Sequence, residues 1–259
     1  EKFSEIQDVI LRIQTDGDPV AMTCKEAVES GVVPNKLVAY YLGILTEFYE
    51  KTGIDITKSR FRKLGDKEKA FYAEVAFDFE VETTIGWLEL VACNYRSDYD
   101  LTSHATKSKQ KFEIMDGDDK VLPHVFEISM GIDRSLYTIL EHSLKDDKEH
   151  ERMVLALKPY LSPVHIGILS LVKKDGLKEK TDEIYLQLKR KCDAFLDHSG
   201  AIGRRYRRLD EIGSPFAITV DHQTLEDETV TIRMRDSMEQ KRIKISELDS
   251  EVIQSIAYP

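Results

Sequence analysis

The 259-residue sequence has few cysteines and no long apolar run. Its three cysteines, Cys24, Cys93 and Cys192, are far apart and include no CxxC pair, which argues against a disulfide framework and a cysteine zinc site. No apolar run approaches the roughly 18 residues that a membrane-spanning helix needs, and no charged-then-apolar leader opens the sequence. We therefore expect a soluble, cytoplasmic protein with no membrane partner.

Several familiar catalytic signatures are also missing. The sequence contains no GxxxxGKS loop, no GxGxxG after a strand, no GxSxG elbow and no HExxH motif. Its seven histidines show no metal-ligand spacing, so we predict no metal site in the protein itself. These absences argue against the P-loop, dinucleotide-binding, serine hydrolase and zinc protease classes.

The composition and the distribution of charged residues predict a folded protein with two domains. Hydrophobic residues make up 41% of the chain and charged residues 32%, which allows a sizeable core. The charged stretch 145–152 predicts a boundary between a domain at residues 1–151 and a domain at residues 152–259. Because the first residue is Glu1 rather than Met, we expect the sequence to be part of a longer chain.

Charge is distributed unevenly between these two domains. The net charge is −10, yet residues 152–259 hold 18 Lys and Arg against 17 Asp and Glu. Twelve of these basic residues lie in three clusters, at 189–191, 204–208 and 233–244. They form either a solvated surface or a set of contacts to nucleic-acid phosphates, and the sequence leaves both interpretations open.

Periodicity predicts helices followed by a β-hairpin in the first domain. Thr23 and Glu26 have capping-box spacing, and Asn35 is expected to cap a helix that ends at Gly53. The predicted core-facing stripe of that helix consists of Leu37, Tyr41, Ile44, Leu45 and Phe48. Alternation predicts antiparallel strands at 71–81 and 87–93, and it places Trp87, Glu89, Val91 and Cys93 on one face. We interpret residues 103–120 as a loop or irregular insertion and residues 123–130 as a third strand.

The second domain alternates strands with helices. We predict strands at 164–172, 215–221, 229–235 and 242–245, a helix at 182–196, and a last helix capped by Ser246. This order is typical of a small α/β domain built around a mixed sheet.

The strongest local pattern joins the third strand to the helix that follows it. Alternation puts Glu127 and Ser129 on one strand face, and Gly131 then opens a helix with Arg134 in its first turn. Helix amides and a guanidinium favour a phosphate, so this pattern indicates a nucleotide site. The alternative is a surface strand followed by an arginine that forms an ion pair within its helix. In the same way, Glu89 could be an ordinary exposed acid and Arg96 could belong to an ordinary ion pair in a loop.

Several motifs together resemble the glycyl-tRNA synthetases of the archaeal and eukaryotic α2 type, which are class II aminoacyl-tRNA synthetases. In the first domain the matching segments are Gly86-Trp87-Leu88-Glu89, Arg96-Ser97-Asp98-Tyr99-Asp100-Leu101, Glu127-Ile128-Ser129 and Gly131-Ile132-Asp133-Arg134. In the second domain they are Gly200-Ala201-Ile202-Gly203-Arg204-Arg205-Tyr206, Asp210-Glu211-Ile212-Gly213 and Arg235-Asp236-Ser237-Met238. The resemblance covers nearly the whole chain.

The resemblance implies an α+β fold with an antiparallel class II catalytic sheet, followed by an α/β anticodon-binding domain with a mixed sheet. It implies a glycine–tRNA ligase that makes glycyl-adenylate from glycine and ATP with Mg²⁺, and then transfers the glycyl group to tRNA(Gly). It also implies a homodimer in the full-length protein. Catalysis of this kind rests on positioning and charge neutralisation.

The resemblance also implies roles for individual residues. Arg134 matches the motif 3 arginine that binds ATP, Glu89 an acid near ATP, and Arg96 a catalytic arginine near the substrate, while Glu127 and Ser129 match residues that hold the glycine amino group. The implied tRNA-binding residues are Arg204, Arg205, Arg208, Asp210, Glu211, Arg235 and Asp236.

The sequence also departs from the family pattern. Ile128 stands where proline is usual and Ala92 where glycine is usual. The regions that would carry motifs 1 and 2 are expected to be absent, so we expect the polypeptide to be inactive alone. Two alternatives stay open: a non-catalytic synthetase-like accessory subunit, and a protein whose anticodon domain acts only as an RNA binder.

Overall fold

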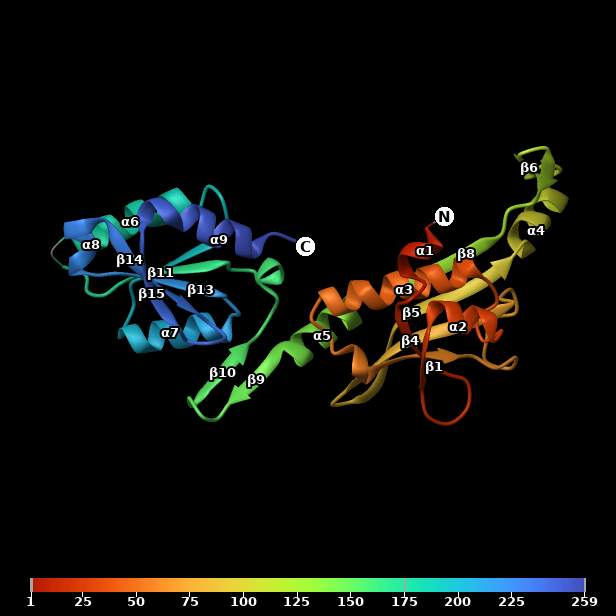
Figure 1. Cartoon of the computed structure of the whole chain (residues 1–259), viewed down its shortest axis with the longest axis horizontal. Helices are drawn as coiled ribbons and strands as arrows, with labels where there is room; N and C mark the ends of the chain where they lie inside the picture. Colours follow the sequence, from red (N-terminus) through yellow and green to blue (C-terminus); the bar gives the residue numbers. More distant parts are fainter. Residues whose placement is uncertain (1, 175, 259) are drawn as a thin grey trace. The chain divides into compact units, whose positions relative to one another are not determined.

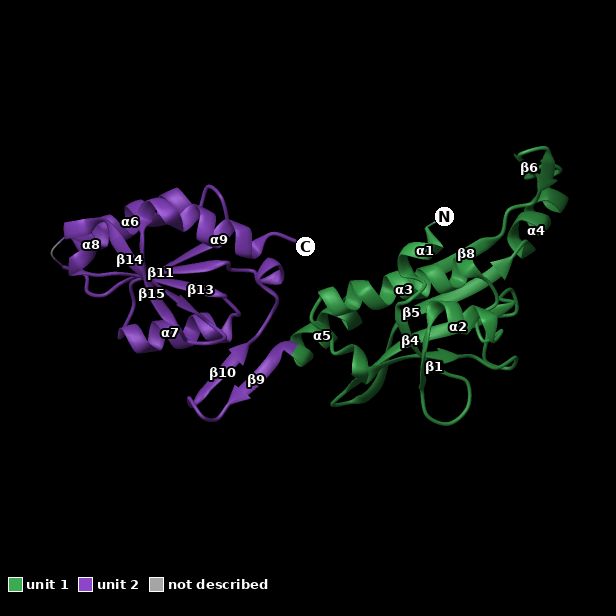
Figure 2. Cartoon of the chain, in the orientation of Figure 1, with its two compact units in different colours: residues 1–142 green, residues 143–259 purple. Residues whose placement is uncertain are grey.

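The computed structural model describes residues 2–174 and 176–258, and the chain divides into two compact units, residues 1–142 and 143–259 (Figure 2). Unit 2 begins with an antiparallel hairpin of β9 (Leu144–Asp147) and β10 (Arg152–Leu155). The sequence-based boundary at residue 152 falls within this hairpin. The hairpin groups with unit 2 because Arg152 donates hydrogen bonds to Asp210 (3.0 Å) and to the Arg235 carbonyl (2.9 Å).

Unit 1 is built on a six-stranded sheet with the order β2-β1-β3-β4-β5-β8. The strands are β1 (Ile10–Gln14), β2 (Val20–Thr23), β3 (Ser59–Lys63), β4 (Val75–Thr83), β5 (Gly86–Ser97) and β8 (Val125–Met130). All neighbouring pairs are antiparallel except β1 with β3. The predicted hairpin is confirmed as β4 and β5, and the predicted third strand as β8.

Helices cover one face of this sheet (Figure 1). They are α1 (Phe3–Ile6), α2 (Cys24–Glu29), α3 (Lys36–Lys51) and α5 (Ile132–Ser143), with the 3-10 turn η1 at Ile56–Lys58. The predicted caps are confirmed: Thr23 and Glu26 form a capping box, and Asn35 accepts from the amide of Val38 at 3.0 Å. A buried hydrogen bond of 2.8 Å between the hydroxyls of Tyr49 and Ser135 joins α3 to α5.

The prediction of which side of α3 faces the core was wrong. Leu37, Tyr41, Ile44 and Phe48 are exposed, and only Leu45 of that set is buried. The buried stripe consists instead of Val38, Ala39, Leu42, Leu45 and Tyr49. Apolar residues recur at helical spacing on two sides of α3, so periodicity identifies a helix without deciding which side meets the sheet.

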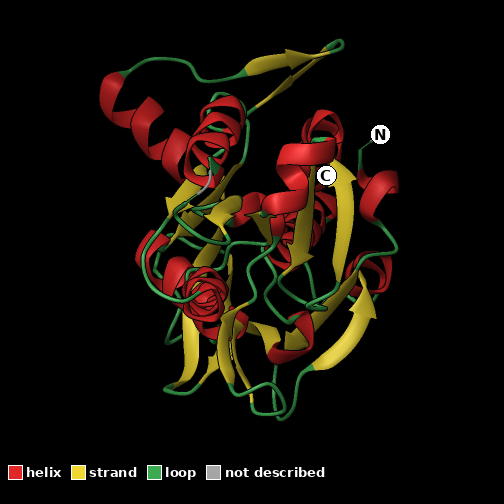
Figure 3. Ribbon diagram, turned by 90° about the vertical axis from the view of Figure 1, so that its left-hand side faces the viewer, coloured by secondary structure: helices red, strands yellow, loops and turns green. Residues whose placement is uncertain are grey.

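Two further differences from expectation concern the start of β4 and the segment that follows β5. The strand begins at Val75 rather than at Phe71, and Phe71 lies outside it with 85% of its side chain exposed. The segment from 103 to 120 is partly regular: α4 (Tyr99–Ser108) is followed by a hairpin of β6 (Ile114–Asp116) and β7 (Asp119–Val121). The sequence 116–119 makes the hairpin turn, and the hairpin projects from the body of unit 1 (Figures 1 and 3).

Unit 2 contains a five-stranded mixed sheet with the order β12-β11-β13-β14-β15. Its strands are β11 (Ile166–Ser170), β12 (Ala194–Asp197), β13 (Phe216–Val220), β14 (Thr229–Met234) and β15 (Gln240–Lys244). β11 is parallel to β12 and β13, whereas β13, β14 and β15 pair antiparallel. The predicted mixed sheet is therefore confirmed.

Helices pack on both faces of the second sheet (Figure 1). α6 (Leu177–Leu188) and α9 (Leu248–Ile256) cover one face, and α7 (Ile202–Glu211) covers the other. α8 (His222–Asp227) and the 3-10 turns η2 (Pro159–Leu161) and η3 (Ile245–Glu247) complete the described elements. α7 packs close because Gly167 lacks a side chain: a Cβ there would lie 2.2 Å from Leu209.

The helix predicted at 182–196 was wrong at both ends. α6 starts at Leu177, and residues 194–197 form the parallel edge strand β12. The apolar residues Ala194 and Leu196 continue the helical spacing of α6 by coincidence, and they pack against the same core cluster from the sheet. Pairing with β11, which is distant in sequence, decides their conformation.

Candidate active site

The candidate site lies on the face of the unit 1 sheet that the helices leave open. Glu127 pairs with Asn94 and Ser129 with Ala92 in the β5–β8 register, so the carboxylate and the hydroxyl project from the same face. The opposite face carries Phe77, Cys93 and other core residues under the helices. The sequence-based expectation that Glu127 and Ser129 lie on one face agrees with this register.

A β-bulge brings Glu89 onto this open face. The β4–β5 register shifts so that Glu80 pairs with Glu89 whereas Phe79 pairs with Val91, and Leu90 is the extra residue. Trp87 and Glu89 therefore lie on the open face, while Val91 and Cys93 are buried in the core. Regular alternation had placed all four on one face, and that expectation was wrong because it assumed an uninterrupted strand.

Arg134 reaches the same face from the first turn of α5. The amide of Gly131 donates to the Leu90 carbonyl at 2.8 Å, which fixes the start of the helix beside the bulge. Nη1 of Arg134 then donates to the Glu89 carbonyl at 3.0 Å and lies 3.7 Å from Glu89 Oε2. About half of each side chain remains exposed, so both charged groups are open to a ligand.

Arg96 lies at the other end of the open face. Its guanidinium donates to Glu127 Oε2 at 2.9 Å and to Asp100 Oδ1 at 2.6 Å, and it stacks over the Tyr72 ring at 3.9 Å. Hydrogen bonds to Asp100 and then Glu127 raise the pKa of Arg96. The row of side chains thus runs from Arg134 and Glu89, through Ser129, to Glu127 and Arg96.

A second group of charges on this face was missed from the sequence. Glu80 accepts from Arg60 at 2.7 Å and from Arg62 at 3.0 Å, and Arg62 also donates to Asp78 at 3.1 Å. Burial raises the pKa of Asp78 to about 6, and the charge of Glu89 adds to the rise while Arg62 opposes it. The signal available in the sequence was the alternation of basic residues in 60–62 and acidic residues in 78–80.

The tRNA-binding residues predicted in unit 2 divide into exposed and buried sets. Arg204, Glu211 and Asp236 are exposed, and Arg208 is half-exposed and bonded to Asp197 and Ser199. The other three predicted residues are buried: Arg205, Asp210 and Arg235.

These buried residues hold the interior of unit 2 together. Asp210 accepts from Arg152 at 3.0 Å and from Arg233 at 2.8 Å. Arg235 donates to the carbonyls of Gly213 and Leu157, each at 2.8 Å, and Arg205 donates to the Ser170 carbonyl at 2.7 Å. The expectation that Arg205, Asp210 and Arg235 contact tRNA directly is therefore corrected, because their polar groups face other protein groups.

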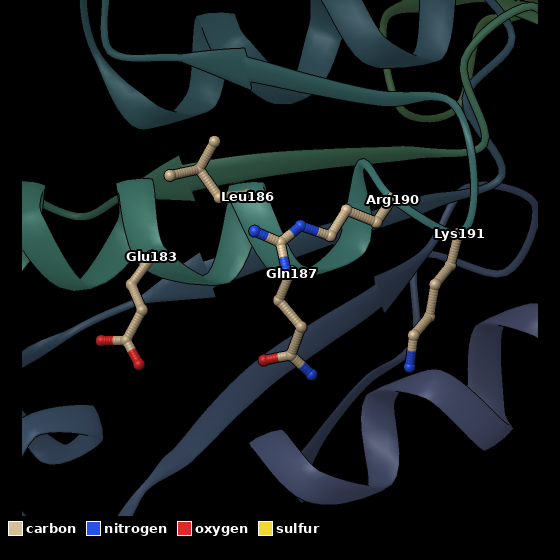
Figure 4. Close-up of a pocket in the computed structure, with 5 residues that line it drawn as sticks. All are labelled: Glu183, Leu186, Gln187, Arg190 and Lys191. Atoms are coloured by element: carbon tan, nitrogen blue, oxygen red, sulfur yellow. The ribbon is translucent and has the colours of Figure 1, made fainter.

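Other hollows and clusters add nothing to this site. A hollow in unit 2 is lined by residues of α6 and the turn after it, and Figure 4 shows them: Glu183, Leu186, Gln187, Arg190 and Lys191. None of them is a predicted site residue. Within residues 2–174 and 176–258, no three His, Cys, Asp or Glu side chains gather to hold a metal, and no helix is long and apolar enough to cross a membrane.

Comparison with known proteins shows which proteins the chain is similar to. A family model described as an anticodon binding domain matches residues 165–255. The chain is 35% identical to the glycine–tRNA ligase of Archaeoglobus fulgidus, over 94% of this chain and 56% of the relative. It is 40% identical to that of Treponema denticola, over 79% of this chain and 48% of the relative. The chain is a homologue of the glycine–tRNA ligases.

The solved structures agree with this family at the level of the fold. Prolyl-tRNA synthetase from Cryptosporidium parvum, complexed with L-proline and AMP, matches with a TM-score of 0.62 and 20% identity, over 92% of this chain and 48% of that chain. The resemblance to the glycine–tRNA ligases drawn from motifs is confirmed, as is the class II α+β fold with an anticodon-binding domain. This homologue spans about half the length of the curated ligases that it matches.

Proposed function

We propose that the chain carries the glycine and ATP face and the tRNA-binding domain of a glycine–tRNA ligase. One observation carries the proposal: Glu127, Ser129, Arg134 and Glu89 share an open sheet face in a homologue of these ligases. Glycine offers only an ammonium, a carboxylate and very little bulk, so its recognition needs a carboxylate and a hydroxyl held on a rigid surface. β5 and β8 provide that surface.

In the proposed first step Glu127 and Ser129 bind the glycine ammonium and Arg134 binds ATP, which arrives as its Mg²⁺ complex. A glycine carboxylate oxygen attacks the α-phosphorus, and the bond to the bridging oxygen breaks, so that pyrophosphate leaves with the electron pair. Arg134 supports this step by neutralising charge on the phosphates, while Arg96 holds the Glu127 carboxylate in place at 2.9 Å. The residues contribute positioning and charge rather than a covalent bond.

In the proposed second step a hydroxyl oxygen of the terminal tRNA ribose attacks the glycyl carbonyl carbon. The bond from that carbon to the phosphate oxygen breaks, AMP leaves with the electron pair, and the hydroxyl proton passes to a phosphate oxygen of AMP. We propose tRNA(Gly) as the substrate, a homodimer as the full-length enzyme, and a cytoplasmic location, which the three free cysteines support.

A glycyl-adenylate analogue with a non-hydrolysable sulfamate link tests the proposal by calorimetry. We expect the wild-type chain to bind it and the Arg134→Ala variant to bind it at least tenfold more weakly, with equal thermal stability of the two proteins. Binding of a prolyl or alanyl analogue with equal affinity would contradict glycine specificity. Because the chain spans 56% of the Archaeoglobus relative, binding is the property to measure first, and pyrophosphate exchange the second.

The accessory-subunit alternative makes a different prediction for the same titration. The substitutions Ile128 and Ala92 lie on the strands that carry the glycine face, and they are the observation that favours it. A chain that binds tRNA but shows no measurable affinity for the analogue at millimolar concentration supports this alternative and contradicts the ligase proposal.

A further inference from the structure

An exposed aromatic cluster lies beside the candidate amino-acid site. Among the described residues no large hydrophobic side chain is more exposed than Phe71, at 85%. Its ring makes edge-to-face contacts with Tyr72, at 5.3 Å between centroids, and with Tyr99, at 6.0 Å. We call these three residues the aromatic platform.

The aromatic platform is linked to the glycine face by direct contacts. The Arg96 guanidinium stacks over Tyr72 at 3.9 Å and donates to Glu127 at 2.9 Å. Phe71 is therefore separated from the proposed ammonium-binding carboxylate by Tyr72 and Arg96 only. The links along this path measure 5.3 Å between the Phe71 and Tyr72 ring centroids, 3.9 Å from the Tyr72 centroid to the Arg96 guanidinium and 2.9 Å from Arg96 to Glu127.

The chemistry of the aromatic platform fits an unpaired nucleobase. The Phe71 ring is exposed and held edge-to-face by Tyr72 and Tyr99, so it needs little ordering on binding, and one stacked base contributes roughly 5- to 150-fold in affinity. The Arg96 guanidinium stacks on Tyr72 beside these rings, while Asp100 and Glu127 accept its hydrogen bonds. The β4 strand begins only at Val75, so Phe71 gives no core packing in exchange for its exposure.

We propose that the aromatic platform stacks the terminal adenine of tRNA and so brings its ribose hydroxyl to the glycyl carbonyl carbon. This inference rests on the proposed function, because it takes Glu127 and Ser129 as the groups that hold glycine. Phe71 acts as a positioning residue for the second step, and Tyr72 and Tyr99 support its ring.

The test uses the full chain and RNA minihelices that end in CCA or, without the last nucleotide, in CC. We expect the wild type to bind the CCA end about tenfold more tightly, and Phe71→Leu to bind both ends equally. Phe71→Trp should keep the preference, since the larger ring can still stack. Ile85→Ala is the matched control, because Ile85 is 72% exposed in the β4–β5 turn and lies outside the aromatic platform.

A second measurement reports directly whether the terminal base is stacked. 2-Aminopurine in the terminal position should lose fluorescence on binding to the wild type and to Phe71→Trp, and keep it with Phe71→Leu. Equal wild-type affinity for both RNA ends, or a CCA preference that survives in Phe71→Leu, would overturn the proposal. So would a change from dimer to monomer in Phe71→Leu without any change in RNA binding, because the occupant would then be a second copy of the chain.

These outcomes are distinguishable from a failure of the proposed function. Phe71→Leu should bind the glycyl-adenylate analogue as the wild type does, because Glu127 and Ser129 lie on β8, outside the aromatic platform. If the chain binds the analogue but shows no preference for the CCA end, only the role proposed for the aromatic platform is overturned. CCA preference without analogue binding overturns the ligase proposal and, with it, the role given to the stacked adenine.

Discussion

Two arginines of unit 1 and three of unit 2 are used in opposite ways. In unit 1 the side chains of Arg96 and Arg134 are 21% and 54% exposed, and each has a carboxylate partner on an open sheet face. In unit 2 the side chains of Arg152, Arg233 and Arg235 are at most 7% exposed and bond to Asp210 or to main-chain carbonyls. Arg96 and Arg134 are therefore placed to offer charge to a ligand, whereas Arg152, Arg233 and Arg235 join elements of the fold.

The difference shows how burial decides the role of an ion pair. A half-exposed pair stays hydrated, contributes little to stability, and can exchange its partner for a ligand at small cost. A buried pair has lost its water, so removing one partner leaves a desolvated charge. The predictions below test this division.

The largest effect should come from Asp210→Ala. This change leaves Arg152 and Arg233 without their shared carboxylate, and we expect the free energy of unfolding of unit 2 to fall by about 3–5 kcal/mol. Urea unfolding measures it. Asp236→Ala is the control, since Asp236 pairs with Arg235 at 2.8 Å but is 67% exposed, and it should cost below about 1 kcal/mol. Equal losses in the two variants would contradict the distinction.

Glu127→Gln should give the next largest effect, on binding instead of stability. Removing the carboxylate charge is expected to weaken the glycyl-adenylate analogue about 10- to 100-fold, because a hydrogen bond to a charged group contributes about 1.5–3 kcal/mol. The free energy of unfolding should change by less than about 1 kcal/mol, since the Arg96 pair is partly exposed. Glu82→Gln, an exposed carboxylate at the far end of β4, should alter neither quantity.

Sequence reasoning succeeded where local rules and tertiary structure agree. The Thr23 and Asn35 caps, the β4–β5 hairpin and the shared face of Glu127 and Ser129 all follow from side-chain chemistry or from strand alternation over a few residues. The fold class and family came from motif order along nearly the whole chain.

Sequence reasoning failed where contacts with residues distant in the sequence decide the conformation of a segment or the burial of a side chain. The choice between two apolar stripes of α3 depends on the sheet beneath it, and the bulge at Leu90 depends on the register with β4. The burial of Arg205, Asp210 and Arg235 was unpredictable for the same reason, because most of their partners come from residues 152–170 and 213–233, with Asp197 as a further partner of Arg205. A cluster of charged residues in a sequence does not indicate which of its side chains are exposed to solvent.

Asp78 tests an intermediate case, a carboxyl that is 8% exposed although it lies on the sheet face that the helices leave open. Burial raises its pKa to about 6, above the value of roughly 3.9 expected in the unfolded chain. The folded state therefore binds more protons between pH 4 and 6, and the contribution of Asp78 to stability falls as the pH rises through that range. Asp78→Asn should raise the free energy of unfolding by about 1–2 kcal/mol at pH 8 and by almost nothing at pH 4. A gain that is the same at both pH values would show that ionisation of Asp78 is not the cause.

The smallest effect, and the closest comparison, involves two adjacent arginines of α7. Arg204 is exposed, whereas Arg205 is buried and donates to the carbonyls of Ser170 and Asp197 at 2.7 and 3.2 Å. If Arg204 contacts a tRNA phosphate, Arg204→Ala should weaken tRNA binding about threefold at 0.1 M salt and reduce the slope of log affinity against log salt by about 1, with unchanged unfolding. Arg205→Ala should instead lower the unfolding midpoint of unit 2 and leave the salt slope of the remaining folded protein unchanged. A lower salt slope in the Arg205 variant with full stability would assign the phosphate contact to the buried neighbour and contradict the division between the two classes of arginine.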